Sequence, residues 1–194
     1  MEKINENIFH QYNKWKQGYE RKENSIKIRL NDFLDRNPLY RDNLSISEDG
    51  KCVNCTGNIF IYDRDLINGK FPFPFGTVID GDFSCSECKE LISLEGAPEK
   101  VEGCFSCKEC PKLTSLKGAP QIVDGFFNCG YCKNLKSLEG APEKSGRWFA
   151  CAGCESLTSL EHLPKEVGTL YVDKRFKGEI SSDILARKYN IKYG

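Results

Sequence analysis

The chain has 194 residues, enough for one substantial domain or for a small domain with an elongated array, and 28 basic and 28 acidic residues give it a formal net charge of +0. This balance excludes the broad positive surface of a dedicated nucleic-acid binder, so we expect no direct nucleic-acid partner. The eleven cysteines are odd in number and no export signal accompanies them, which argues against a disulfide framework. No apolar run is long enough to cross a bilayer, so we expect a cytoplasmic protein that does not act on membranes.

The first 43 residues are predicted to form a helical cap. Apolar residues recur there at spacings of four and three, as on one face of an amphipathic helix over about residues 3–22. These residues are Ile4, Ile8, Tyr12, Trp15 and Tyr19. The following segment, residues 24–40, fits either a second helix or a strand.

Residues 44–76 are predicted to form a β-rich cap or a degenerate first repeat. Apolar and polar residues alternate from Leu44 and again from Ile59, and an Asp-Gly pair ending at Gly50 predicts a turn. Cys52 and Cys55 lie in this region, out of phase with the cysteines that follow. We interpret this pair as part of the packing of a hairpin, and the alternative is half of a metal site.

A 22-residue unit is repeated after residue 76. Each copy holds one CxxC pair: Cys85/Cys88, Cys107/Cys110, Cys129/Cys132 and Cys151/Cys154. A phenylalanine precedes each pair by two residues, two leucines follow in register, and Gly-Ala-Pro closes the first three units. Period-two alternation in the first half of the unit predicts a short half-buried strand. One such unit cannot bury its apolar face alone, so the units must stack into a solenoid.

The unit resembles the leucine-rich repeat. The run from Phe83 to Leu91, F-x-C-x-x-C-x-x-L, is similar to the L-x-L-x-x-N/C-x-x-L pattern of that family. "SLEGAP…VxGxFxC" is similar to repeats in bacterial and bacteriophage proteins, which implies a bacterial host cell. The resemblance covers residues 77–176, about five units. It departs from the pattern at Ser145–Arg147, which replaces the V-x-G start, and at Val167–Phe176, which has lost one residue and both cysteines.

These patterns together predict an α+β fold. We expect a leucine-rich-repeat solenoid of short stacked parallel strands, with an N-terminal helical cap before it and a C-terminal cap over residues 177–194. Ser181 or Ser182 is a suitable N-cap residue, which predicts a short capping helix at this end.

The CxxC pairs admit two interpretations. Their C-x2-C-x18-C-x2-C spacing is typical of zinc sites, and zinc would then be held by Cys85, Cys88, Cys107, Cys110, Cys129, Cys132, Cys151 and Cys154. We favour the alternative, in which both cysteines are small buried side chains of a packed ladder, because Phe, Leu and Gly-Ala-Pro keep the same spacing. We therefore predict no metal and no cofactor. Cys104 lies in a column expected to face solvent and is the candidate for a reactive thiol.

No catalytic constellation is recognisable, and we predict that the protein is not an enzyme. His10 and His162 are the two histidines, and neither has a sequence context that suggests a nucleophile–base pair. Asp63 and Asp65 form a small charged cluster, which we interpret as a solvated turn rather than as paired acid and base.

The outward columns of the predicted sheet indicate a partner-binding face. The N-terminal half of this face is acidic, with Asp80, Asp82, Glu87, Glu102 and Asp124. The C-terminal half is aromatic, with Phe126, Tyr131, Arg147, Trp148 and Tyr171. Aromatic and arginine side chains carry most interface energy, so we expect the second group to contact a protein and the acidic group to steer a basic segment of it.

The leading hypothesis is a non-enzymatic module that binds a protein partner stoichiometrically, as an adaptor, effector or inhibitor. A phage-encoded inhibitor of a host protein such as a nuclease is the specific version that the resemblance suggests. The alternative is a zinc-binding CxxC protein that contacts nucleic acid. An exposed final strand or the aromatic patch also allows a homodimer.

Overall fold

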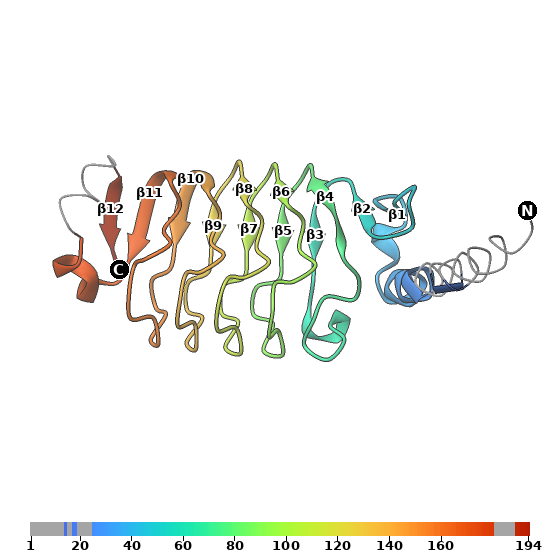
Figure 1. Ribbon diagram of the computed structural model, residues 1–194, viewed down its shortest axis with the longest axis horizontal. Coiled ribbons are helices and arrows are strands. Elements are labelled where there is room, and N and C mark those ends of the chain that lie inside the picture. Colours follow the sequence, from blue (N-terminus) through green and yellow to red (C-terminus); the bar gives the residue numbers. More distant parts are fainter. Residues whose placement is uncertain (1–13, 15–16, 19–24, 181–188) are drawn as a thin grey trace, which may run out of the picture.

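The computed structural model describes residues 14, 17–18, 25–180 and 189–194. These residues form a β-solenoid of about six turns, with helical residues 25–36 at one end of the stack and the last strand, β12 (Asn190–Tyr193), at the other (Figure 1). The strands that follow the first hairpin pair in parallel, so the predicted solenoid of stacked parallel strands is confirmed. No helix in the described part of the chain is long and apolar enough to span a membrane.

The N-terminal segment that was ambiguous between helix and strand is a helix. Residues 25–36 are helical and lead into the 3-10 turn η1 (Pro38–Tyr40). Ile26, Leu30 and Phe33 recur at spacings of four and three and are buried, which is the pattern of an amphipathic helix. The helix predicted over residues 3–22 lies outside the described residues, apart from 14 and 17–18.

The predicted hairpin is confirmed. Strands β1 (Leu44–Ile46) and β2 (Val53–Cys55) pair antiparallel, and Gly50 takes a φ of 69° in the turn between them. Cys52 is half-buried and Cys55 is buried, so this pair belongs to the hairpin packing. In the parallel pairing of β2 with the next turn, Cys55 lies opposite Ile79.

Each turn of the array contributes two short strands to one face, and they stack into two rows (Figure 1). The upper row in Figure 1 comprises β4 (Phe75–Ile79), β6 (Lys100–Val101) and β8 (Ile122–Val123). The lower row comprises β3 (Ile59–Phe60), β5 (Phe83–Ser84), β7 (Phe105–Ser106) and β9 (Phe127–Asn128). The two rows merge in the longer strands β10 (Lys144–Ala150) and β11 (Glu166–Val172).

A glycine separates the two strands of a turn because the backbone of the preceding turn leaves no room for a side chain. A Cβ on Gly103 would lie 2.6 Å from the carbonyl of Gly81 and 2.3 Å from the carboxylate of Asp82. Arg147 follows Gly125 in this column by 22 residues, and there the pairing of β10 with β11 shifts register. The loss of glycine thus coincides with the point where the two rows become one strand.

The core is built from the predicted inward columns. The rings of Phe83, Phe105, Phe127 and Phe149 are fully buried and stack with centroid distances of 5.4, 5.0 and 5.4 Å. The two leucines that follow each cysteine pair are buried as well. The four turns that carry these phenylalanines therefore bury the same set of side chains against one another. A buried phenylalanine contributes about 3–5 kcal/mol when judged by truncation to alanine.

The C-terminal end extends the sheet further than the repeat pattern indicates. After β11 and the 3-10 helix η3 (Lys174–Gly178), β12 pairs in parallel with β11. The predicted boundary at residue 176 therefore does not coincide with the end of the sheet. The helix predicted from Ser181 or Ser182 lies outside the described residues.

Candidate functional site

The predicted aromatic residues of the exposed face lie together over three successive turns. Trp148 stacks on Phe126 with ring centroids 4.1 Å apart and planes 7° from parallel. Tyr171 meets Trp148 edge-on at 5.6 Å and 77°. Phe126, Trp148 and Tyr171 are half-buried, whereas Tyr131 is 55% exposed. Because the repeats stack in register, these aromatic rings form a continuous surface.

A cleft of about 340 Å³ opens beside these rings, and we call it the aromatic cleft. Its lining residues are Lys108, Asn128, Gly130, Tyr131, Trp148, Ala150, Ala152 and Tyr171. Gly130 has no side chain and Ala150 and Ala152 have small ones, which leaves the space between the three aromatic residues open. The cleft is consequently apolar over most of its lining, with Lys108 and Asn128 as its polar members.

Tyr131 reaches the aromatic cleft from a left-handed backbone position. It is the third residue of its CxxC turn and has a φ of 60°, as Glu87 and Glu109 have 63° and 60° in the preceding turns. The equivalent residue of the following turn is Gly153, where a Cβ would lie 2.5 Å from the Tyr131 ring. Glycine at 153 therefore provides the room that the tyrosine ring occupies.

Two lysine side chains lie close to the tyrosine rings of the aromatic cleft. The Lys108 Nζ lies 5.4 Å from the ring centroid of Tyr131, and the Lys192 Nζ lies 5.6 Å from that of Tyr171, both within the range of cation–π attraction. Neither lysine was predicted from the sequence as part of the site. Lys108 occupies an outward column of the repeat and could have been predicted from it. Lys192 belongs to β12, which the repeat pattern does not include.

Arg147 is exposed and precedes Trp148 in β10. It does not line the aromatic cleft. It is close enough to Cys104 for its charge to oppose the pKa increase that burial causes in that thiol. Arg147 therefore flanks the aromatic surface on the Phe126 side. Cys104 is half-buried rather than solvent-facing, and burial is the main cause of its raised pKa.

Two of the acidic residues expected to steer a partner serve the stacking of the turns. The Asp80 carboxylate accepts a hydrogen bond from the backbone N–H of Gly57. The Asp82 carboxylate accepts one from the backbone N–H of Cys104 at 2.7 Å. Both carboxylates thus satisfy backbone donors of a neighbouring turn at the bend between the two rows of strands.

The remaining acidic residues are exposed. Lys100 pairs with Glu102 at 3.0 Å and with Asp124 at 3.2 Å. One lysine therefore partly neutralises two carboxylates. Glu87 is exposed in its CxxC turn.

The second cysteine of each CxxC pair in the 22-residue repeats donates its thiol hydrogen to a carbonyl of the preceding turn. The Sγ–O distances are 3.1 Å from Cys110 to Cys85 and 3.0 Å from Cys132 to Cys107. Cys154 donates in the same way to Cys129 at 3.1 Å. These carbonyls lie just beyond the strands of the lower row, where the sheet ladder ends. The thiols therefore continue the hydrogen bonding of the stack into the turn.

The cysteine pairs are buried in the core, and their burial has an electrostatic consequence. It raises the pKa of the Cys88 and Cys154 thiols to about 12 from the ordinary 9.0, so both thiols are protonated at neutral pH and can donate hydrogen bonds. In the described part of the chain, no group of three or more His, Cys, Asp or Glu side chains is placed to hold a metal ion. The geometry is that of a packed ladder.

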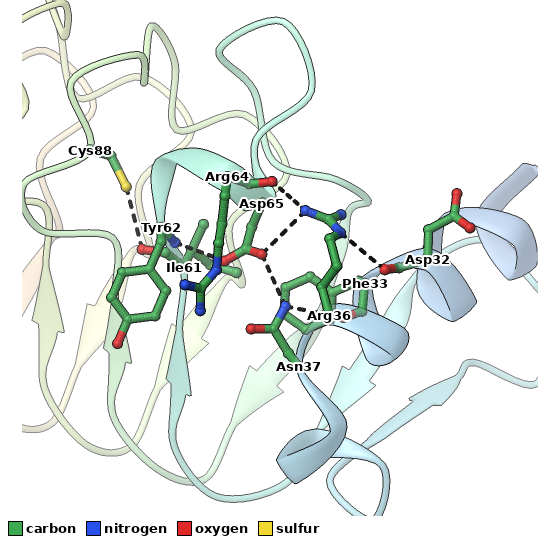
Figure 2. Close-up of polar contacts among 9 residues, drawn as sticks. All are labelled: Asp32, Phe33, Arg36, Asn37, Ile61, Tyr62, Arg64, Asp65 and Cys88. Carbon is green, nitrogen blue, oxygen red and sulfur yellow. Dashed lines mark hydrogen bonds and ion pairs between the residues drawn. The ribbon is translucent and has the colours of Figure 1, made fainter.

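The charged cluster around Asp65 is a structural anchor, and its interpretation as a solvated turn was wrong. Asp65 is fully buried and accepts hydrogen bonds from the Asn37 side chain and the Tyr62 backbone, both at 3.0 Å, with Arg36 at 3.5 Å (Figure 2). Asp63 accepts from two backbone N–H groups of the next turn. The cluster joins helical residues 25–36 to the first turn of the solenoid.

His162 is exposed and takes a φ of 66° where the preceding units have glycine. His10 lies outside the described residues.

Comparison with protein-family models, with curated proteins and with solved structures finds no match for this chain.

Proposed function

We propose that the protein is a non-enzymatic binding module that holds another protein in the aromatic cleft, as an adaptor, effector or inhibitor. The observation that carries this proposal is the cleft itself, where Tyr131, Trp148 and Tyr171 from three turns surround small residues and stay partly exposed. Tryptophan and tyrosine are the side chains that most often dominate the energy of a protein interface. A solenoid face that presents them in register is suited to that use.

The arrangement also limits the entropic cost of binding. Trp148 is held between Phe126 and Tyr171, so little rotational freedom is left to lose when a partner covers it. Tyr131 keeps a left-handed backbone, which costs roughly 1–2 kcal/mol in a residue other than glycine. Glu87 and Glu109 share this backbone, so the difference at Tyr131 is the exposed aromatic ring, which adds nothing to the core and favours a role on the surface.

We also propose which type of repeat builds the solenoid. We infer a leucine-rich repeat in which phenylalanine and cysteine replace leucines of the inward columns. Support comes from the thiol of Cys110 and its equivalents, which donate to backbone carbonyls at the position where that family has Asn or Cys. Bacterial or phage origin, and inhibition of a host protein such as a nuclease, rest on the sequence resemblance alone.

The test is capture of a partner on the immobilised full chain, followed by affinity measurement with single variants. Tyr131→Glu is the most informative variant, because Glu87 and Glu109 occupy the same left-handed position in neighbouring turns and the fold accommodates them. Loss of a central aromatic residue is expected to weaken binding about 30-fold, equivalent to ~2 kcal/mol. Trp148→Ala should have at least the same effect.

Phe60→Ala is the matched control. Phe60 lies on the same exposed face, is 40% exposed, and is in the first parallel turn, far along the stack from the aromatic cleft. Its removal should leave affinity unchanged. A partner that binds the Tyr131 and Trp148 variants as tightly as the unaltered protein, with their circular dichroism spectra intact, would refute the assignment of the cleft.

A further inference from the structure

The charges around the aromatic cleft are mostly positive. Lys108 lines it and Lys192 lies over the ring of Tyr171. Arg147 is the residue before Trp148 and is exposed. Lys108 and Lys192 therefore lie at the cleft, from the CxxC turn and from β12, and Arg147 lies outside it, next to Trp148 in β10.

The carboxylates nearest to the cleft are already paired. Glu109 accepts the Lys108 amine at 2.6 Å. Asp173, in the turn after Gly153, accepts a backbone hydrogen bond and lies 3.5 Å from the Arg175 guanidinium. By contrast, neither Arg147 nor Lys192 has an ion-pair partner among the described residues. The local charge that remains for a partner is therefore positive.

The acidic columns do not reverse this balance at the cleft. Asp80 and Asp82 keep their charge, but Asp82 lies three turns before Trp148, about 14 Å along the stack at ~4.8 Å per strand. Lys100 partly neutralises Glu102 and Asp124. Glu87 lies two turns before Tyr131, about 10 Å along the stack at ~4.8 Å per strand. Charges separated by more than about 8 Å are largely screened at physiological ionic strength.

The positive charge favours an acidic occupant, and the size and apolar lining of the cleft favour one with a large apolar side chain. A space of about 340 Å³ between three aromatic rings and the small residues Gly130, Ala150 and Ala152 is large enough for an aliphatic or aromatic side chain and a short stretch of its backbone. Apolar contact supplies affinity there, and the surrounding cations supply orientation and association rate.

We infer that the aromatic cleft takes an acidic peptide segment of a partner protein, with Asp or Glu residues flanking a large apolar side chain. This inference rests on the proposed function and names the chemistry of the partner, which is opposite in charge to the basic segment that the sequence suggested. The apolar side chain enters between Tyr131 and Trp148. The flanking carboxylates meet Lys192 on one side and Arg147 on the other.

The experiment is selection from a random peptide library on the immobilised full chain, with no assumption about charge. Selected peptides are then synthesised together with charge-reversed versions in which each Asp or Glu becomes Lys. Binding is followed by isothermal titration calorimetry, which reports on every variant, including Trp148→Ala. The expected selection is net negative peptides with one large apolar residue, and charge reversal should weaken them at least tenfold.

Two variants test the cations directly. Arg147→Glu together with Lys192→Glu is expected to weaken the selected peptides about tenfold or more and to remove most of the salt dependence of binding. Lys89→Glu is the control, because Lys89 is an exposed lysine in an early turn of the array, and it should change affinity less than twofold. Equal effects of the two sets of substitutions would overturn the inference.

The outcomes separate this inference from the proposed function. Selection of neutral or basic peptides whose binding is lost in Tyr131→Glu would overturn the acidic partner and leave the protein-binding cleft in place. Peptides that bind Tyr131→Glu and Trp148→Ala unchanged would overturn both. Tighter, Trp148-dependent binding of a single-stranded oligothymidylate of about 15 nucleotides would also overturn both, because aromatic rings flanked by lysines would then be stacking bases.

Discussion

Replacing Cys132 separates the hydrogen-bonding role of the cysteine ladder from a role as metal ligand. The Cys132 thiol is fully buried and donates to the Cys107 carbonyl at 3.0 Å. Cys132→Ala leaves that carbonyl without its donor, at roughly 1–3 kcal/mol, and removes a buried group worth about 1 kcal/mol. We expect the free energy of unfolding to fall by about 2–4 kcal/mol. Cys132→Ser keeps a donor at the same place and should lose only about 1–2 kcal/mol.

The assay is urea denaturation under reducing conditions, followed by far-ultraviolet circular dichroism. Cys104→Ala serves as the control, because Cys104 is half-buried and outside the ladder, and its cost should stay below about 1 kcal/mol. If serine destabilises as much as alanine, the hydrogen bond is not what the cysteine supplies. A lower midpoint of the unaltered protein after chelation would instead show that metal holds the turns together.

Three further predictions concern stability. Stability should fall as pH rises from about 9 to about 12. Burial raises the pKa of the Cys88 thiol to about 12, so it stays protonated in the folded protein, whereas in the unfolded chain the thiol has a pKa near 9.0 and releases its proton. The free energy of unfolding should fall by about 1.4 kcal/mol per pH unit for each such thiol, as measured by denaturation across this range. Glu109→Gly should raise the free energy of unfolding by about 0.5–1 kcal/mol, because glycine removes the strain of the left-handed backbone, and an unchanged or lower melting temperature would contradict this. Asp65→Ala should lower the free energy of unfolding by about 3 kcal/mol and reduce hydrogen-exchange protection in helical residues 25–36. The control Asp35→Ala removes an exposed ion pair and should lower it by less than about 1 kcal/mol. Equal losses would refute the anchoring role of Asp65.

The stacking of the turns was predictable because a solenoid aligns each residue with its equivalent one repeat away. The 22-residue spacing therefore gave the buried columns of Phe105 and Cys107 and the outward column of Trp148 without knowledge of any single contact. The same alignment brought Phe126 and Trp148 together. The neighbours of a residue are therefore predictable where they are its own equivalents in the adjacent repeats.

Three features that have no copy in the array were not predicted. Ile26, Ile28 and Leu30 alternate as in a strand, and the 60% exposure of Ile28 shows that the helical pattern was the relevant one. The burial of Asp65 depends on Asn37, 28 residues earlier and in another element. Strand β12, and with it Lys192, has only four residues and no repeat signal.

The two-residue strands of the lower row also determine how the molecule would respond to force. Each of these strands bonds only to the turns before and after it, so tension applied at the ends would load one junction between turns at a time. A released turn of 22 residues would lengthen the chain by about 75 Å at ~3.4 Å per residue. Stretching of a single molecule would therefore lengthen it in a regular series of equal steps, one for each turn released.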